Sequence, residues 1–335
     1  MGERISIKQI ADEAGVSTAT VSRVINTPER VTEARRARVQ SIIRRYHYQP
    51  SLLAKSLRNS STPIIGMMVP DIANEFFAKI VIHLQRDLFE AGYWTIIYNS
   101  DLSGTMQQSY LKLLMDQNIC GLFVISNDSA SIELPEHVPT VFVDRHPRDC
   151  TRFKKHAIVE SDNRQGGMLA AEALLRAGCQ QPAMITTNED IHIFSDREQG
   201  FESALRGVGL ALDPSLTVRM RQISVSMGEQ AVLQLIDAGE TFDGLFATAD
   251  FFAIGALQGL KARGIRVPAD VKLVGFDDNA LTRFCQPPLT TVHQHYEAIS
   301  KAAVDAMLRL ILQDDVMPVR RSLPVSLVER ESTVG

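Results

Sequence analysis

The chain has 335 residues and a formal net charge of −4; hydrophobic residues make up 45% of it and charged residues 22%. This composition is ordinary for a well-cored globular protein and excludes disorder over most of the chain. No apolar run reaches the roughly 18 residues of a membrane span, and the first residues lack a signal-peptide core, so we expect a cytoplasmic protein with no membrane partner. Four scattered cysteines without a C-x-x-C pair indicate reduced thiols.

The net charge is unevenly distributed along the chain. Residues 1–60 hold eleven Lys and Arg against five Asp and Glu, whereas the remaining 275 residues carry 24 basic and 34 acidic groups. A basic segment on an acidic body is typical of nucleic-acid binding, because Lys and Arg replace the counterions condensed on the phosphates. A solvated basic face would carry the same charge, so charge alone leaves both interpretations open.

Three short helices are predicted in residues 1–49. Apolar residues at helical spacing indicate a first helix that ends at Gly15, a residue that turns with positive φ at no steric cost. Ser17 is a candidate N-cap for a second helix over 18–25, and a third helix is expected over about 33–46. Two helices joined by a tight glycine turn predict a helix-turn-helix unit that reads DNA in the major groove, with a generic helical bundle as the alternative.

Short apolar runs alternate with helices from residue 63 to residue 335. Strands are expected at 64–69, 94–98, 121–125, 140–143, 183–185, 244–247 and 272–276. This alternation predicts an α/β fold with parallel sheets covered on both faces, and its length suits two doubly wound subdomains. Ligands of such sheets bind at the carboxyl ends of the strands, so the cleft between two subdomains is the expected pocket.

Two long motifs identify a family. IKQIADEAGVSTATVSRVIN occupies 7–26 and YQPSLLAKSLR occupies 48–58, and shorter matches follow at 69–71 (VPD) and 289–292 (LTTV). Together they resemble the lactose-repressor/galactose-repressor (LacI/GalR) family of bacterial transcription regulators over the whole chain. Such proteins are ligand-responsive DNA-binding regulators, so the resemblance implies that function here.

The resemblance implies a division into three parts. An N-terminal all-α helix-turn-helix DNA-binding headpiece takes 1–49, a hinge helix and linker take 50–62, and a core similar to periplasmic binding proteins takes 63–335. The core binds the effector and forms the dimer. Its N-subdomain is expected at about 63–161 and 293–322, and its C-subdomain at about 162–292 and 323–335.

The resemblance assigns DNA contacts by position. The residues that would face base edges are Thr18, Ala19 and Arg23. Those that would touch the phosphate backbone, and so set register without reading sequence, are Ser17, Thr20, Ser22, Asn26 and Thr32. Independently, arginine suits bidentate bonding to guanine, and an alanine methyl can contact a thymine methyl.

The hinge is expected to bind the minor groove. Its residues after Pro50 predict barely two helical turns, which are marginal alone in water. By resemblance, Leu57 is the wedge that unstacks a base step and bends the DNA, with Ala54 beside it. Without the resemblance, the leucines of this segment are interpreted as ordinary packing residues of a linker.

Six residues match the effector cleft of the family. Those near strand ends are Asp144, Arg197, Asp250 and Asp277, with Arg197 expected just before a helix, and the aromatic wall is Phe76 and Phe77. Carboxylates and a guanidinium can hydrogen-bond vicinal hydroxyls, which suits a sugar, and Arg197 can equally hold a phosphate or carboxylate. Taken singly, each aspartate is also a candidate cap or loop residue.

Three departures from the family pattern bear on the effector. Glu75 stands where proline is common, Ala249 stands where asparagine is common, and the segment 191–194 is more apolar than usual. A modified or partly apolar sugar derivative therefore remains open, and a nucleobase-like corepressor is the alternative to a carbohydrate.

The expected function is a repressor of carbohydrate-utilisation genes. It would bind a near-palindromic operator as a homodimer, because two-fold protein symmetry demands two-fold operator symmetry; a tetramer is left open. The effector would favour one angle between the two subdomains over another and thereby move the hinge segments. The sequence leaves open whether the effector is an inducer or a corepressor.

Two other classes of protein compete with this interpretation. A solute-binding protein predicts an export signal and no basic headpiece, and an enzyme of this fold predicts a cofactor motif or an activated nucleophile. We find neither set of features, so no catalysis and no cofactor are predicted. His293-x-His295 is typical of a strand or loop, so no metal site is predicted either.

Overall fold

The computed structural model describes residues 7–26, 31–46, 62–99, 104–125, 138–147, 149–150, 153–188, 191–313 and 317–334. The chain divides into two units, Met1–Pro63 and Ile64–Gly335, which are described separately. Within the described residues, no helix has both the length and the apolar character needed to span a membrane.

The described residues of the first unit form a headpiece of three helices. Its helices are α1 (Ile7–Ala14), α2 (Thr18–Asn26) and α3 (Glu33–Arg45). They bury a small apolar core: Ile10, Ala11, Ala14, Val21, Val24, Val39 and Ile42. Gly15 joins α1 to α2 with φ +64°, and its N–H donates to the Asp12 carbonyl at 3.2 Å. The helix-turn-helix predicted from the glycine turn is therefore present.

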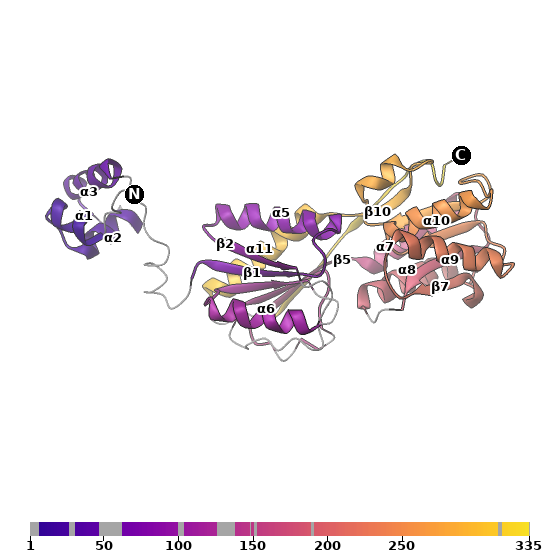
Figure 1. Cartoon of the computed structure of the whole chain (residues 1–335), viewed down its shortest axis with the longest axis horizontal. Coiled ribbons are helices and arrows are strands. Elements are labelled where there is room, and N and C mark those ends of the chain that lie inside the picture. Colours follow the sequence, from indigo (N-terminus) through magenta and orange to yellow (C-terminus); the bar gives the residue numbers. More distant parts are fainter. Residues whose placement is uncertain are drawn as a thin grey trace. The chain divides into compact units, whose positions relative to one another are not determined.

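The second unit contains two six-stranded sheets, each covered by helices on both faces. The first sheet has the order β11-β5-β4-β3-β1-β2, and all its pairs are parallel. Its strands are β1 (Ile64–Val69), β2 (Trp94–Asn99), β3 (Gly121–Val124), β4 (Thr140–Val143), β5 (His156–Ser161) and β11 (Val319–Leu323). Its helices are α5 (Glu75–Glu90), α6 (Gly104–Asp116) and α11 (Tyr296–Leu312). Figure 1 shows α5 and α6 on opposite faces of this sheet.

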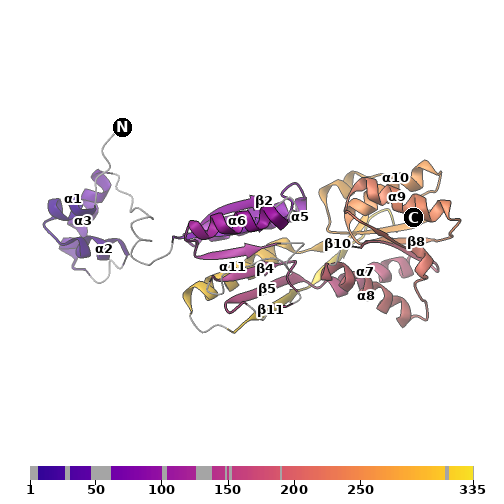
Figure 2. The same ribbon diagram turned by 60° about the horizontal axis from the view of Figure 1, so that its bottom comes forward.

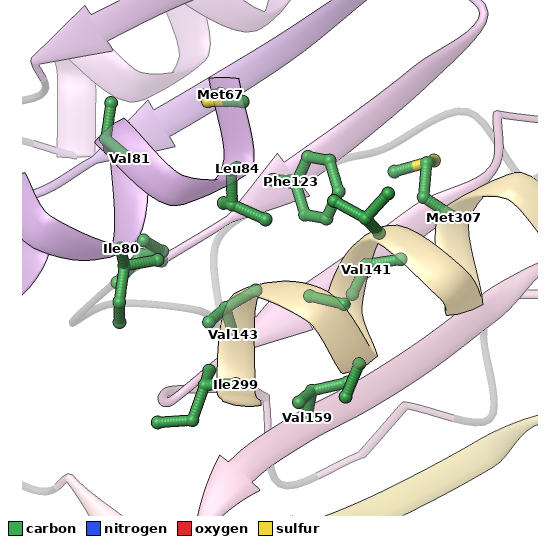
Figure 3. Packing of buried hydrophobic residues seen from close by; sticks show 14 of the residues in the cluster. Met67, Ile80, Val81, Leu84, Phe123, Val141, Val143, Val159, Ile299 and Met307 are labelled. Atoms are coloured by element: carbon green, nitrogen blue, oxygen red, sulfur yellow. The ribbon is translucent and has the colours of Figure 1, made fainter. Parts of the chain in front are cut away.

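Helices α5 and α11 share one face of the first sheet. Leu84 of α5 and Met307 of α11 belong to the same buried cluster as Phe123 of β3 and Val141 of β4, as Figure 3 shows. The central strands β1, β3, β4 and β5 are buried, because α6 covers the other side of the sheet with Leu111 and neighbours, whereas the edge strands β2 and β11 are partly exposed.

The second sheet has the order β12-β10-β9-β8-β6-β7 and is parallel except for the β10–β12 pair. Its strands are β6 (Pro182–Thr187), β7 (Thr217–Met220), β8 (Gly244–Ala247), β9 (Lys272–Phe276), β10 (Thr290–Gln294) and β12 (Val325–Val328). Its α-helices are α7 (Asn163–Arg176), α8 (His192–Gly207), α9 (Val225–Asp237) and α10 (Asp250–Ala262). Two 3-10 turns, η2 (Pro214–Leu216) and η3 (Ala280–Phe284), complete it. Figure 2 shows α7 and α8 on one face and α9 and α10 on the other.

The chain crosses between the two sheets three times: from β5 to α7, from β10 to α11, and from β11 to β12. The sequence places these crossings near 161/162, 292/293 and 322/323. In the structure β10 remains paired in the second sheet as far as Gln294, and β11 remains paired in the first as far as Leu323. The α/β architecture with two doubly wound parallel sheets is confirmed.

Candidate functional site

The outer face of α2 presents small polar side chains. The Ser17 hydroxyl caps the helix by accepting a hydrogen bond from the Thr20 N–H at 3.2 Å, and the two hydroxyls lie 3.0 Å apart. Ser17, Thr18 and Ala19 are exposed at the N-terminal end of the helix, and Arg23 is exposed one turn further on. The apolar side of α2 is buried, so the exposed side is available to a groove of DNA.

The other residues predicted to contact DNA have different positions in the structure. Thr32 is exposed immediately before α3. Ser22 and Asn26 lie in α2, and only their backbone is described. Ala54 and Leu57 lie outside the described residues, as does the rest of the hinge segment 50–61.

The second unit has a polar cleft between its two sheets. Residues from both subdomains line it: Asn74, Glu75, Phe76, Lys79, Asp250, Phe251, Asp277, Asp278, Asn279 and Tyr296. The space left among them is about 10 Å³, which is room for roughly one water molecule. This part of the cleft is therefore closed, and a larger ligand at this point requires the subdomains to separate.

Arg197 lies next to the cleft, beside its lining residue Asp277, and is only 2% exposed. Its Nε donates to Asn163 Oδ1 at 2.8 Å, and its Nη1 donates to the Thr248 carbonyl at 2.7 Å. Its guanidinium stacks on the Phe276 ring at 3.6 Å from the centroid and lies 3.7 Å from Asp277 Oδ1. These contacts fix the cation in one orientation, and a ligand at this point meets a preorganised donor.

Arg197 lies inside α8 rather than before a helix, so that prediction was wrong. The helix begins at His192, and Ile191 at the N-cap position makes no side-chain hydrogen bond. Ser195 and Asp196 are the fourth and fifth residues of this helix. Burial of Ile193 and Phe194 against the protein interior starts the helix early.

The carboxylates of Asp250 and Asp277 are held close together. Asp250 begins α10, is 1% exposed, and accepts hydrogen bonds from Thr291 Oγ1 and the Asn279 N–H, both at 2.7 Å. Burial and the neighbouring Asp277 charge raise the pKa of Asp250 well above its ordinary value. Burial raises the pKa of Asp277 to about 6, although the Arg197 charge opposes that rise. A ligand that donates hydrogen bonds to Asp250 and Asp277 would therefore stabilise the ionised form of both carboxyl groups.

Asp144 follows β4 with φ +64° and is 2% exposed. Its Oδ2 lies 3.6 Å from Nε of Arg145, whose guanidinium carbon lies 5.1 Å from the centroid of the Phe77 ring and 6.0 Å from that of the Phe194 ring. Asp144 also interacts electrostatically with Asp277 and Arg197. The structure thus brings the six predicted effector residues into one cluster, because Phe76 lines the cleft beside Asp250 and Asp277.

Three buried polar atoms around the cluster have no hydrogen-bond partner: Asp144 Oδ1, Gln294 Oε1 and Thr248 Oγ1. Buried polar atoms are nearly always paired, and leaving one unpaired costs about 1–3 kcal/mol. Two of these atoms are pure acceptors and the third can donate or accept. They therefore favour a ligand that carries several hydroxyl groups.

Glu75, one of the departures from the family pattern, joins the two subdomains. Its Oε2 accepts a hydrogen bond from the Ala280 N–H at 2.7 Å across the cleft, and its Oε1 lies 2.7 Å from the Lys79 ammonium. Lys79 in turn lies over the Tyr296 ring at 4.8 Å. A proline at position 75 could not make this contact.

Several cleft residues were not predicted from the sequence. Arg145, Asn163, Thr248 and Gln294 contribute charge or hydrogen bonds to the cluster. Only Arg145 had a local signal, because it directly follows the strand-end Asp144. The others come from segments whose proximity depends on the folding of the whole second sheet.

Two family models match the chain. One, described as the lacI family of bacterial regulatory proteins, matches residues 6–51, and the other, described as a periplasmic binding protein-like domain, matches residues 171–333. The regulator RegA of Clostridium saccharobutylicum is 31% identical over 98% of this chain and 99% of that protein. The ribose operon repressor of Escherichia coli K12 has the same identity and coverage. The repressor PurR of Aliivibrio fischeri is 31% identical over 92% of this chain and 93% of that protein.

Solved structures give the same result. A complex of the regulator CelR with cellobiose superposes with a TM-score of 0.73 at 28% identity, covering 98% of this chain and all of that one. The Lac repressor bound to ONPG superposes with a TM-score of 0.78 at 25% identity, with the same coverage.

A helix-turn-helix headpiece joined to a two-subdomain core with a polar cleft defines a ligand-responsive, DNA-binding transcriptional repressor. The chain belongs to the LacI family of bacterial regulatory proteins.

Proposed function

We propose that the chain represses carbohydrate-utilisation genes and responds to a small polyhydroxylated effector, a sugar or sugar derivative, in the cleft around Arg197. The observation that carries this proposal is the set of unpartnered buried atoms, Asp144 Oδ1, Gln294 Oε1 and Thr248 Oγ1, beside a fixed guanidinium. Hydroxyl groups would pair with all of them. As a regulator of bacterial genes, the protein would act in the cytoplasm.

The effector class can be tested by a thermal-shift screen of the full-length protein. Sugars, sugar phosphates, sugar acids and nucleobases are compared at equal concentration, because a ligand that binds only the folded state raises its melting temperature by mass action. We expect a sugar or sugar derivative to stabilise the protein. Stabilisation by nucleobases alone would replace the carbohydrate proposal with the corepressor alternative, which the aromatic Phe76 and Phe77 pair and the PurR relative favour.

We further propose that the cleft binds without catalysis. The carboxylates of Asp250 and Asp277 are occupied as hydrogen-bond acceptors: Asp250 from Thr291 and the Asn279 N–H, and Asp277 from Gln294. A general base must instead be free to reach a substrate proton. Incubating the stabilising ligand with the protein and recovering it unchanged would support this proposal, and its turnover would contradict it.

The exposed face of α2 is proposed to read the operator in the major groove. Replacing Arg23 with Ala should relax discrimination at one operator base pair by about 1–3 kcal/mol, because a bidentate arginine contact to guanine is lost. The measurement is a competition binding series against operators mutated one base pair at a time. Arg35, exposed on α3, supplies the control: Arg35→Ala should leave the base preferences unchanged. An Arg23→Ala protein with wild-type base preferences would remove this residue from the reading surface.

The hinge is part of the same proposal. Leu57 is proposed as the minor-groove wedge and Ala54 as its neighbour, on the strength of the family resemblance. Both lie outside the described residues, so these roles stay predictions.

An exposed apolar patch supports a homodimer. Ile82 and Phe89 on α5 and Trp94 on β2 are 62%, 66% and 53% exposed, and the Phe89 and Trp94 rings lie 5.9 Å apart edge to face. Clustered exposed apolar side chains of this size are typical of protein interfaces.

Charging this patch should separate the dimer. Replacing Ile82 with Asp should convert the dimer to a monomer at micromolar concentration and weaken operator binding, because a carboxylate is buried without a partner at the contact. Sedimentation velocity measures the first effect and operator titration the second. Leu113→Asp, on α6 over the opposite face of the sheet, is the matched control and should leave the dimer intact. A dimeric Ile82→Asp protein would place the interface elsewhere.

A further inference from the structure

Two histidines and one glutamate converge at the junction of the two subdomains. His146 follows β4, Glu160 lies in β5, and His192 is the first residue of α8 in the second subdomain. The Glu160 Oε2 atom lies 3.3 Å from His192 Nε2 and 3.5 Å from His146 Nε2, and the imidazole centroids are 4.1 Å apart. The side chains of His146 and Glu160 are only 9% and 4% exposed.

These separations are those of ligands around one metal ion. Zinc takes histidine nitrogen and carboxylate oxygen at roughly 2.0–2.2 Å, so two ligands of a tetrahedral site lie roughly 3.3–3.6 Å apart. The three ligand atoms of this cluster all lie within 4.8 Å of one another, so a small ring rotation closes the remaining edge. As an imidazole–carboxylate hydrogen bond the contact to His146 is too long, and His146 Nε2 is buried without a hydrogen-bond partner.

Neighbouring groups orient two of the three ligands. His146 Nδ1 lies 2.7 Å from the Pro147 carbonyl oxygen, which leaves Nε2 as the ring nitrogen that faces the cluster. Arg320 Nε donates to Glu160 Oε1 at 2.6 Å, which leaves Oε2 as a single oxygen ligand. In metal sites, a ligating histidine typically hydrogen-bonds a backbone carbonyl through its other ring nitrogen, and a ligating carboxylate is itself hydrogen-bonded.

The charge of the surroundings also suits a cation. The carboxylate of Asp196, one turn along α8 from His192, interacts electrostatically with both His192 and Glu160 and offsets the charge of Arg320. Two imidazoles with one carboxylate favour zinc and related transition metals over Mg²⁺ and Ca²⁺, which prefer oxygen ligands alone.

We propose that His146, Glu160 and His192 form a binding site for a divalent transition metal of the zinc class, with one coordination position left for water or an effector oxygen. The ligands come from both subdomains, so the bound ion holds β4 and β5 against α8. It thereby favours the closed arrangement of the cleft and acts as a co-effector, a role beyond the effector site around Arg197.

The site is tested by calorimetric titration of zinc chloride into the full-length protein after chelator treatment. We expect one zinc ion per chain, and at least tenfold weaker binding by the His192→Ala protein. His83→Gln, which removes a histidine of α5 outside the cluster, is the matched control and should bind zinc like the wild type. The melting temperature of each apo variant is measured first, so that a folding defect is recognised.

A second variant and a second readout keep the result decisive. His146→Ala should weaken zinc binding as His192→Ala does, and Co²⁺ bound to the wild type should give the strong visible absorption of tetrahedral cobalt, which both variants lose. Absence of zinc binding by the wild type, or unchanged affinity in both variants, would overturn the proposal. Neither measurement uses operator or effector, so it remains interpretable if the proposed carbohydrate response fails.

Discussion

Replacing Arg197 with Ala should abolish the effector response while operator binding by the unliganded protein remains. Arg197 is buried, and it orients its donors through Asn163, the Thr248 carbonyl and the Phe276 ring. Truncating one partner of a buried, hydrogen-bonded charge pair costs about 2–5 kcal/mol, so effector affinity should fall at least about 30-fold. Operator binding followed by fluorescence anisotropy, with and without the stabilising ligand, measures both parts.

The control for this experiment is Arg164→Ala. Arg164 is an exposed arginine on α7 whose Nη1 lies 3.4 Å from Gln199 Oε1, outside the cleft cluster, and its loss should leave the response intact. A normal response from the Arg197→Ala protein would remove Arg197 from the effector site.

The same substitution should also make stability more sensitive to pH. The pKa of Asp277 is about 6, above the ordinary 3.8, so its ionisation already destabilises the folded state as pH rises towards neutrality. Arg197 lowers that pKa, and removing the cation raises it further. The loss of melting temperature in Arg197→Ala should therefore be larger at pH 8 than at pH 5. A loss that is equal at both pH values would contradict this coupling.

Replacing Gly200 with Ala should destabilise the core strongly. A Cβ atom at Gly200 would lie 2.0 Å from the Arg164 carbonyl oxygen on α7, and one at Gly167 would lie 1.9 Å from the Arg197 carbonyl oxygen on α8. The obstacles are backbone atoms, so the two helices must separate. Overpacking of this kind costs about 1–3 kcal/mol and should lower the melting temperature by several degrees. Effector binding should weaken as well, because α8 carries Arg197.

Helix α8 also contains the matched control. Gly207 is its last residue, and a Cβ atom there meets nothing within 4 Å. Gly207→Ala should leave the melting temperature unchanged or raise it slightly, because alanine restricts the unfolded chain more than glycine does. Differential scanning calorimetry of the two variants side by side decides the matter, and equal melting temperatures would refute the close-packing argument.

Features that depend on a short stretch of chain could be predicted from the sequence. The headpiece follows from a glycine turn and a serine cap, and the aspartates of the cleft follow apolar runs that can only be strands. By contrast, β5, β7, β10, β11 and β12 are not among the strands predicted from the sequence, and the short edge strands β7 and β11 could not be predicted. They are four and five residues long, β7 is half-buried and β11 is largely exposed, and β11 contains Arg320 and Arg321, so they lack the apolar pattern that marks a buried strand.

Contacts between distant segments could not be predicted from the sequence, for a different reason. His146, Glu160 and His192 are separated by 14 and 32 residues, so no fixed ligand spacing marks them. They meet only because β4 and β5 are neighbours in the first sheet and the chain crosses to α8 in the second subdomain. The role of Glu75 is similar, because its partner, the Ala280 N–H, is 205 residues away.

The last chain crossing has a consequence for biosynthesis. Strands β11 and β12 complete the two sheets, each at an outer edge, and both lie between Val319 and Val328. During translation, both sheets therefore lack an edge strand until synthesis of the chain is nearly finished. Until then, the unpaired sheet edges are exposed and prone to aggregation. A premature stop codon before Val319 would damage both lobes together, although almost all of either lobe would already have been made.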